Sequence, residues 1–283
     1  MTASTEHLLT EAHLNGALQL TRSANWNQNA ADWRLMLALG RAWGITTQEG
    51  TLAASTLVLP YDGFAWVSMV LVLPDQRRKG YASQLLRTAI ACLQDRGLTP
   101  LLDATPAGHE VYVQEGFVDT WGFARYALKQ SFAGRADARG FTVRALEERD
   151  WLALLALDLP AFGASREPLL RALAARLPEA ALVAERDGRM EGWLLGRDGH
   201  EARQIGPLVA RSTDAAQSLL SQALACVPSP VYLDLVDRET GLRQWLETGG
   251  FAFQRPFTRM VHGATVAPGD ASLVVLAAGP ELG

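Results

Sequence analysis

The chain has 283 residues, of which 48% are hydrophobic and 20% are charged, a globular composition that excludes a disordered protein. At roughly 150 residues per domain, the length predicts two domains. The two cysteines exclude a disulfide framework and lack zinc-site spacing, so we expect no metal. A net charge of −4 without a long basic run argues against nucleic-acid binding. With neither a signal peptide nor an apolar run of about 20 residues, we expect a cytoplasmic protein that makes no membrane contact.

Helices and strands alternate over the first 130 residues. The expected strands cover 8–11, 41–47, 52–60, 64–73, 98–102 and 117–128, the last as one or two strands. The expected helices cover 14–24, 31–39, 81–96 and 110–115. The helix at 81–96 has the clearest helical spacing of apolar residues. The run at 64–73 is almost continuously apolar, as a strand buried on both faces is, and Pro74 ends it.

Residues 131–140 are small, polar or charged and predict a linker. Beyond it, the same order of elements returns. The second half begins with a strand at 141–146, helices at 150–159 and 165–177, the latter capped by Ser165, and a hairpin of strands at 181–185 and 190–196. The apolar tail at 271–278 predicts a docked strand.

Short matches at nearly one offset indicate that the second half repeats the first. The matched segments are Leu71-Val72 with Leu208-Val209, Leu85-Leu86 with Leu219-Leu220, Leu101–Asp103 with Tyr232–Asp234, and Gly116-Phe117 with Gly250-Phe251. They predict a duplicated α/β domain covering 1–130 and 141–283. Chance similarity between two α/β segments is the alternative.

A short basic loop, Arg77-Arg78-Lys79, lies between the strand at 64–73 and the helix that follows. Gly80 and Ala82 open that helix, and such small residues let the backbone approach an anion closely. A helix N-terminus presents unpaired N–H groups and a partial positive charge. The segment therefore predicts a pyrophosphate cradle, although it is neither a Walker loop nor a GxGxxG motif.

The spacing Arg77-x-x-Gly80-x-Ala82 resembles the acyl-CoA signature of the GNAT superfamily of N-acetyltransferases, Gln/Arg-x-x-Gly-x-Gly/Ala. Downstream, Tyr112-x-x-x-Gly116-Phe117 resembles the family's Tyr-x-x-x-Gly-Phe. The stretch at 102–112 looks like a bacterial GNAT subgroup with a second, divergent GNAT-like domain. The resemblance implies two tandem GNAT-like domains of the α/β (α+β) class, each a mixed central sheet flanked by helices. It also implies direct transfer of an acetyl group from acetyl-CoA to an amine in a ternary complex.

The same resemblance implies which residues bind acetyl-CoA and which one donates a proton. Strand residues would pair with the pantetheine arm, and loop N–H groups would hold the pyrophosphate. The implied acetyl-CoA-binding residues are Met69, Val70, Leu71, Val72, Arg77, Arg78, Lys79, Gly80, Tyr81, Ala82 and Ser83. Tyr112 would protonate the departing thiolate. The alternative for Tyr112 is an aromatic side chain at the edge of the core, beside Phe117.

The general base is harder to assign. Many family members place a Glu on the strand before the loop, but residues 66–69 contain no carboxylate. Asp103, at the C-terminal end of a buried strand, is the predicted base, with a turn-capping role as the alternative, and His109 is a weaker candidate. At pH 7 an α-amine is roughly 14% neutral and a lysine-type amine about 0.04% neutral. The missing Glu therefore favours an α-amine acceptor or a water relay.

The acceptor is predicted to contact Trp26, Asn27, Gln28 and Trp33, because GNAT proteins commonly build a substrate wall from this region. The alternative for the tryptophans is a place in the core. The sequence leaves open whether the acceptor is a small molecule or a peptide, and whether the protein is a homodimer.

The second half lacks the chemical elements of the first. Its equivalent loop is three residues shorter, contains one Arg and no Gly, and places Asp214 near the helix start. Leu246 stands where Tyr112 stands in the first half. We therefore predict a degenerate domain that binds no acyl-CoA.

Four charged residues of the second half have two readings each. Asp234 and Asp237 either face a cleft or cap turns, and Arg255 and Arg259 either recognise an anion or pair with Asp234. The rival to the enzyme reading is a non-catalytic sensor, in which CoA or a small ligand controls binding to a partner.

Overall fold

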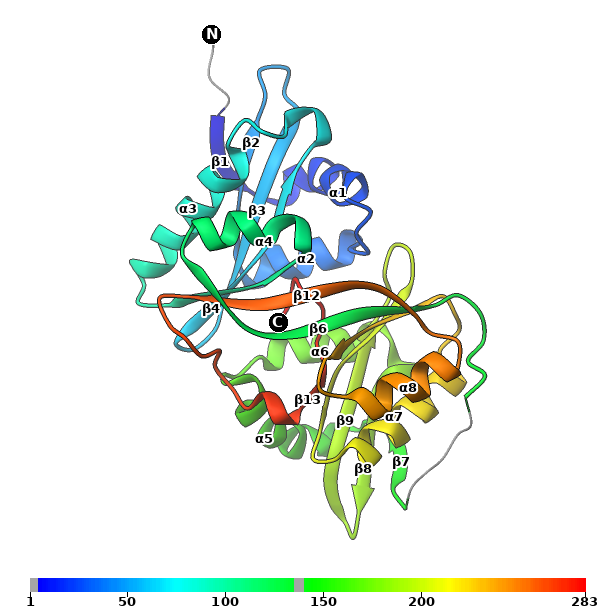
Figure 1. Cartoon of the computed structure of the whole chain (residues 1–283). Coiled ribbons are helices and arrows are strands. Elements are labelled where there is room, and N and C mark those ends of the chain that lie inside the picture. Colours follow the sequence, from blue (N-terminus) through cyan, green and yellow to red (C-terminus); the bar gives the residue numbers. More distant parts are fainter. Residues whose placement is uncertain (1–4, 135–139) are drawn as a thin grey trace.

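The computed structural model describes residues 5–134 and 140–283, so residues 135–139 of the predicted linker lie outside the described part. Two α/β repeats contribute to one mixed sheet of 13 strands (Figure 1). The strands are β1 (Thr5–Leu9), β2 (Arg41–Thr46), β3 (Leu52–Pro60), β4 (Phe64–Val72), β5 (Thr99–Ala104), β6 (Phe117–Leu128), β7 (Thr142–Ala145), β8 (Leu182–Arg186), β9 (Arg189–Arg197), β10 (Arg203–Ala210), β11 (Val231–Val236), β12 (Ala252–His262) and β13 (Val274–Leu276). The helices are α1 (Leu14–Ser23), α2 (Ala30–Leu39), α3 (Tyr81–Gln94), α4 (Pro106–Gln114), α5 (Trp151–Phe162), α6 (Glu167–Arg176), α7 (Thr213–Cys226) and α8 (Thr240–Thr248).

The duplication is confirmed element by element. The series α3, β5, α4, β6 of the first repeat returns as α7, β11, α8, β12 in the second. Two local expectations need correction. Helix α4 begins four residues early, at Pro106, because proline suits the first helical position. Ser165 does not cap α6, since Arg166 takes the N-cap position and turns its side chain inward toward Asp158.

The two repeats exchange their last long strands. The strand order is β1-β2-β3-β4-β5-β12-β6-β11-β13-β10-β9-β8-β7. Strand β12 therefore lies beside β5 of the first repeat, and β6 lies beside β11 of the second. These two strands pair with each other and cross the middle of the molecule (Figure 1). Each repeat is thus completed by a strand of the other.

Two buried ion pairs occupy equivalent places on the exchanged strands. Arg259 of β12 donates to both oxygens of Asp103 on β5, at 2.9 and 3.0 Å. Arg125 of β6 does the same to Asp234 on β11, at 2.8 and 2.7 Å. The expectation that Arg259 pairs with Asp234 is therefore wrong, because strand exchange brings Arg259 to the first repeat.

The helices pack against the sheet over three hydrophobic cores. Helices α1, α2, α5 and α6 share one hydrophobic core that spans both repeats. Helix α3 covers a second core in the first repeat, and α7 and α8 cover a third in the second repeat. In the described part of the chain, no helix is long and apolar enough to cross a membrane.

Candidate active site

A wedge opens between β4 and β5. The two strands pair in parallel only as far as Trp66 and Leu101, although β4 continues to Val72 and β5 to Ala104. Met69 lies in a bulge of β4 with φ of 51°, and the Ser55 hydroxyl donates to its main-chain oxygen at 2.7 Å. A non-glycine residue in this left-handed region costs about 1–3 kcal/mol, which the surrounding structure must offset. The bulge turns β4 away from β5 and leaves an edge with which an extended chain can pair.

The basic loop lies at the end of this wedge. Residues 77–80 are exposed, and Gly80 has φ of 81°, a conformation that favours glycine. Gly80 is the N-cap of α3, where no side chain caps the helix and no acidic residue lies in the first turn. The first N–H groups of α3 are therefore available to an anion, next to Arg77, Arg78 and Lys79.

The equivalent helix of the second repeat has a closed N-terminus. The Ser212 hydroxyl accepts a hydrogen bond from the N–H of Ala215 at 3.2 Å, and Asp214 lies in the first turn of α7. The chain also fills the second wedge itself, because β13 pairs with both β10 and β11 through Leu276. The tail at 271–278 thus contains the docked strand that its composition predicts.

Tyr112 lies on α4 at the edge of the core. Its ring packs edge-on against Phe117, with centroids 6.2 Å apart. A Cβ at position 108 would lie 2.9 Å from the ring, so Gly108 makes the space that Tyr112 occupies. Burial raises the pKa of Tyr112 to about 12, so its hydroxyl keeps its proton at neutral pH. At the equivalent place on α8, Leu246 is fully buried.

The two base candidates already have partners. Asp103 is buried, and both of its oxygens accept hydrogen bonds from Arg259. His109 lies near the surface, with its Nε2 2.8 Å from an oxygen of Asp119. Asp103 as a base stays a prediction: burial raises the pKa of its carboxyl above the ordinary value, while the two hydrogen bonds from Arg259 act in the opposite direction and occupy both oxygens.

The structure places the four predicted acceptor-binding residues as follows, and their contact with an acceptor stays a prediction. Asn27 is buried and binds the β9–β10 connection, accepting from the N–H groups of Glu201 and Ala202 and donating to the Ala202 oxygen. Trp33 is fully buried and donates to the Thr21 hydroxyl at 2.9 Å. The other two are Gln28, which is buried, and Trp26, which packs against the shared core. Buried amides need hydrogen-bond partners, and Asn27 finds them in the second repeat.

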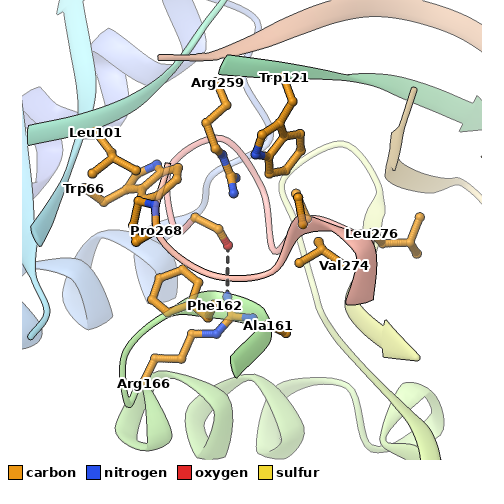
Figure 2. A pocket seen from close by; sticks show the side chains of 13 residues that line it. Trp66, Leu101, Trp121, Ala161, Phe162, Arg166, Arg259, Pro268, Val274 and Leu276 are labelled. Carbon is orange, nitrogen blue, oxygen red and sulfur yellow. Dashed lines mark hydrogen bonds between the residues drawn. The ribbon is translucent and has the colours of Figure 1, made fainter. Parts of the chain in front are cut away.

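A pocket that the sequence did not indicate begins where β4 and β5 part (Figure 2). On one side, the Arg259 guanidinium lies between the rings of Trp66 and Trp121. Its central carbon is 4.3 Å from the ring centroid of Trp66 and 4.1 Å from that of Trp121. On the other side, Arg166 lies over Phe162 at 4.1 Å. Among the described residues, no side chain that lines the pocket is a carboxylate or a histidine, and Gly283 contributes a main-chain oxygen. Of these residues, only Arg259 carried a signal in the sequence, as a candidate anion contact.

In the described part of the chain, no cluster of His, Cys, Asp and Glu side chains could hold a metal ion. The groups found at the wedge are the uncapped helix, the basic loop and the arginine-lined pocket.

Family comparisons agree with this geometry. Residues 6–117 match the acetyltransferase (GNAT) family, and residues 154–274 match an acetyltransferase (GNAT) domain. The chain is 25% identical over 246 residues to the uncharacterized N-acetyltransferase YitH of Bacillus subtilis (strain 168), and the match covers 86% of each protein.

Solved structures show the same fold. A candidate acetyltransferase from Pyrococcus horikoshii matches with a TM-score of 0.81 at 18% identity, over 100% of this chain and 97% of that one. A tandem GNAT protein from the clavulanic acid biosynthesis pathway matches with a TM-score of 0.66 at 15% identity, over 95% of this chain and 100% of that one.

The fold, the uncapped helix beside a wedge in the sheet and the matches define an acyltransferase of the GNAT superfamily. The chain belongs to this superfamily of N-acetyltransferases, as a member with two GNAT domains in tandem.

Proposed function

We propose that the first repeat, residues 1–130, transfers the acetyl group of acetyl-CoA to an amine by direct attack in a ternary complex. The observation that carries this proposal is the uncapped N-terminus of α3 at the end of the wedge between β4 and β5. In the second repeat, residues 141–283, the equivalent helix N-terminus is capped and the equivalent wedge is filled by β13. The experiment is to measure acetyl-CoA turnover, read as free thiol, against a panel of amines, amino acids, aminoglycosides and peptides.

The residues that hold acetyl-CoA in this proposal are those of β4, the loop and α3. The backbone of Met69 to Val72 pairs with the extended arm, and the N–H groups of Gly80 to Ser83 bind the pyrophosphate. Arg77, Arg78 and Lys79 add positive charge there. Arg78 has φ of 62°, the second strained non-glycine residue of this segment after Met69, and such strain gathers at ligand-binding sites.

Proton transfer needs an acid and a path for the amine's proton. The amine nitrogen forms a bond to the acetyl carbon while the carbon–sulfur bond breaks, and Tyr112 gives its proton to the leaving sulfur. Among the described residues no carboxylate side chain lines the pocket, and in this proposal the amine's proton leaves through water. Ser68, on β4 beside the bulge, is buried with no partner for its hydroxyl in the described residues, and it is suited to hold that water.

Substitution of Tyr112 by Phe is expected to lower kcat about 100-fold, the low end of general acid catalysis, with KM for acetyl-CoA unchanged. Because the pKa of Tyr112 is raised to about 12, the wild-type rate should not fall between pH 8 and 10 through loss of this proton. Steady-state kinetics of the wild type and the variant between pH 8 and 10 measure both the fall in kcat and its pH dependence. A wild-type decline centred near pH 10 that is absent in Tyr112→Phe would contradict the protonation state, and an unchanged kcat would contradict the role.

The closed second wedge predicts a single acetyl-CoA site per chain. Calorimetric titration with CoA should give a stoichiometry of one, and removal of the charge at Arg77 and Arg78 by substitution with Gln should weaken that one event. A second binding event that survives this double substitution would mean that the second repeat also binds CoA.

A sensor that binds CoA without transfer is the second candidate, and the pocket without a carboxylate or histidine favours it. Tight CoA binding with no thiol release against the whole panel would select the sensor over the enzyme.

A further inference from the structure

We infer that the pocket of Arg166 and Arg259 binds the carboxylate of the acceptor, so that the acceptor is an amino acid or a close relative with a free carboxylate. This inference rests on the proposed function, because it names the substrate class of that site. Trp66 and Leu101 are the last paired residues of β4 and β5, and both line the pocket. A ligand there would lie beside the wedge that receives the acetyl group.

Each arginine is held rigidly by its own carboxylate. Arg259 uses Nε and Nη2 to bind Asp103, and Arg166 uses Nε and Nη2 to bind Asp158 at 3.0 and 2.9 Å. Both guanidinium groups are more than nine-tenths buried. Their geometry is therefore fixed before a ligand arrives, which reduces the entropy lost on binding.

The third nitrogen of each arginine, Nη1, is not used by its carboxylate partner. Nη1 of Arg166 donates to the main-chain oxygen of Gly283 at 3.0 Å, the bond that Figure 2 draws as a dashed line. Nη1 of Arg259 makes no hydrogen bond within residues 5–134 and 140–283. The two side chains point toward the pocket from opposite sides (Figure 2). Two donors that face one cavity between aromatic walls match the two oxygens of a carboxylate.

Hydrogen-bond acceptors of the chain itself occupy the place where the ligand is expected. Three side chains donate to main-chain oxygens of the segment 280–283: Trp66 to Pro280, Tyr61 to Leu282 and Arg166 to Gly283. The space that remains is about 10 Å³, room for about one water molecule. An amino acid therefore enters only if Gly283 moves aside. The carboxylate of the amino acid then replaces the Gly283 oxygen as the acceptor for Nη1 of Arg166.

Charge favours an amino acid over a simple anion. Because Asp103 and Asp158 already neutralise the two arginines, a bare anion would add an uncompensated charge to a buried site. An amino acid brings its own ammonium group.

The test compares matched acceptors in the full-length protein. The twenty amino acids are assayed for thiol release, and the best is compared with its amide, its methyl ester and its decarboxylated amine. We expect kcat/KM to fall at least about tenfold for each analogue, the effect of losing one charged hydrogen bond. An analogue that reacts as fast as the amino acid would overturn the inference while leaving the acetyltransferase intact.

A double substitution supplies the protein side of the test. Arg166→Met with Asp158→Leu removes one ion pair without leaving a buried charge, and Arg125→Met with Asp234→Leu is the matched control outside the pocket. The first should raise KM for the amino acid about tenfold or more, leave KM for acetyl-CoA unchanged, and have no further effect on the decarboxylated amine. An equal loss for the decarboxylated amine would show a merely structural role.

Direct binding separates this inference from the proposed function. If no amine of any kind releases thiol, the proposed function fails, and the N-acetylated amino acids are titrated by calorimetry instead. Binding that the Arg166 and Asp158 variant loses and the control retains would still support a carboxylate site. Equal affinity in wild type and variant, or none, would overturn it.

Discussion

Replacement of Gly80 by Asp is expected to weaken CoA binding at least about 100-fold while the protein stays folded. The carboxylate would lie at the N-terminus of α3, where it repels the pyrophosphate and competes for the free N–H groups. Two charged hydrogen bonds to a phosphate contribute about 3–6 kcal/mol, which exceeds a factor of 100 in Kd. The fold should tolerate the change, because a Cβ at Gly80 meets no atom within 4 Å and Asp adopts left-handed φ more readily than most residues.

The matched control is Ser212→Asp at the equivalent helix of the second repeat. Asp caps a helix as well as Ser does, so stability should hold and CoA affinity should stay at the wild-type value. Isothermal titration with CoA measures both variants, and circular dichroism checks their folding. Undiminished affinity in Gly80→Asp would remove this helix from the site, and a loss in Ser212→Asp would mean that the second repeat takes part in CoA binding.

The uncapped N-terminus of α3 could be expected from the sequence because its signals are local. Glycine at a helix start, the absence of an acidic first turn and a run of basic residues all lie within a few positions of one another. The contrast with Ser212 and Asp214 was equally local, and the structure gives it a physical form as an open and a capped helix N-terminus. Sequence patterns of a few residues determine the local backbone conformation of the segment that contains them.

The surroundings of Asn27 could not be predicted from the sequence near it. Asn27 was predicted to contact the acceptor because GNAT proteins commonly build a substrate wall from this region. Its partners are main-chain groups of Glu201 and Ala202, about 175 positions away, and no pattern near Asn27 announces them. The arginine pocket could not be predicted from the sequence for the same reason, because Trp66, Arg166 and Arg259 come from three distant segments.

The exchange of β6 and β12 between the repeats could not be predicted from the sequence for a different reason. Asp103 and Asp234 are equivalent, and so are Arg125 and Arg259, so an unexchanged arrangement would form the same kinds of ion pair. The strands themselves therefore do not encode which partner they choose. The repeat was visible in the sequence, but the assignment of β6 and β12 to the opposite repeats depends on how the whole chain is connected.

Replacement of Arg259 by Met is expected to destabilise the protein by about 3–5 kcal/mol, because it leaves Asp103 as a buried charge without a partner. Addition of Asp103→Leu should restore most of that loss, since well-packed apolar residues replace a buried ion pair at little cost. Urea denaturation followed by tryptophan fluorescence measures the free energy of unfolding for the single and the double variant. A single variant as stable as wild type would mean that Asp103 is protonated or hydrated in the folded protein.

The equivalent pair on the other exchanged strand separates stability from function. Arg125→Met with Asp234→Leu should follow the same pattern of loss and recovery in the free energy of unfolding, because both pairs are buried and bidentate. Acetyl transfer should respond differently. The double variant at Arg259 and Asp103 should stay impaired toward the acceptor even when its stability is restored, since Arg259 lines the pocket, whereas the double variant at Arg125 and Asp234 should keep its activity. Equal activity in the two stable double variants would assign both pairs to the architecture alone.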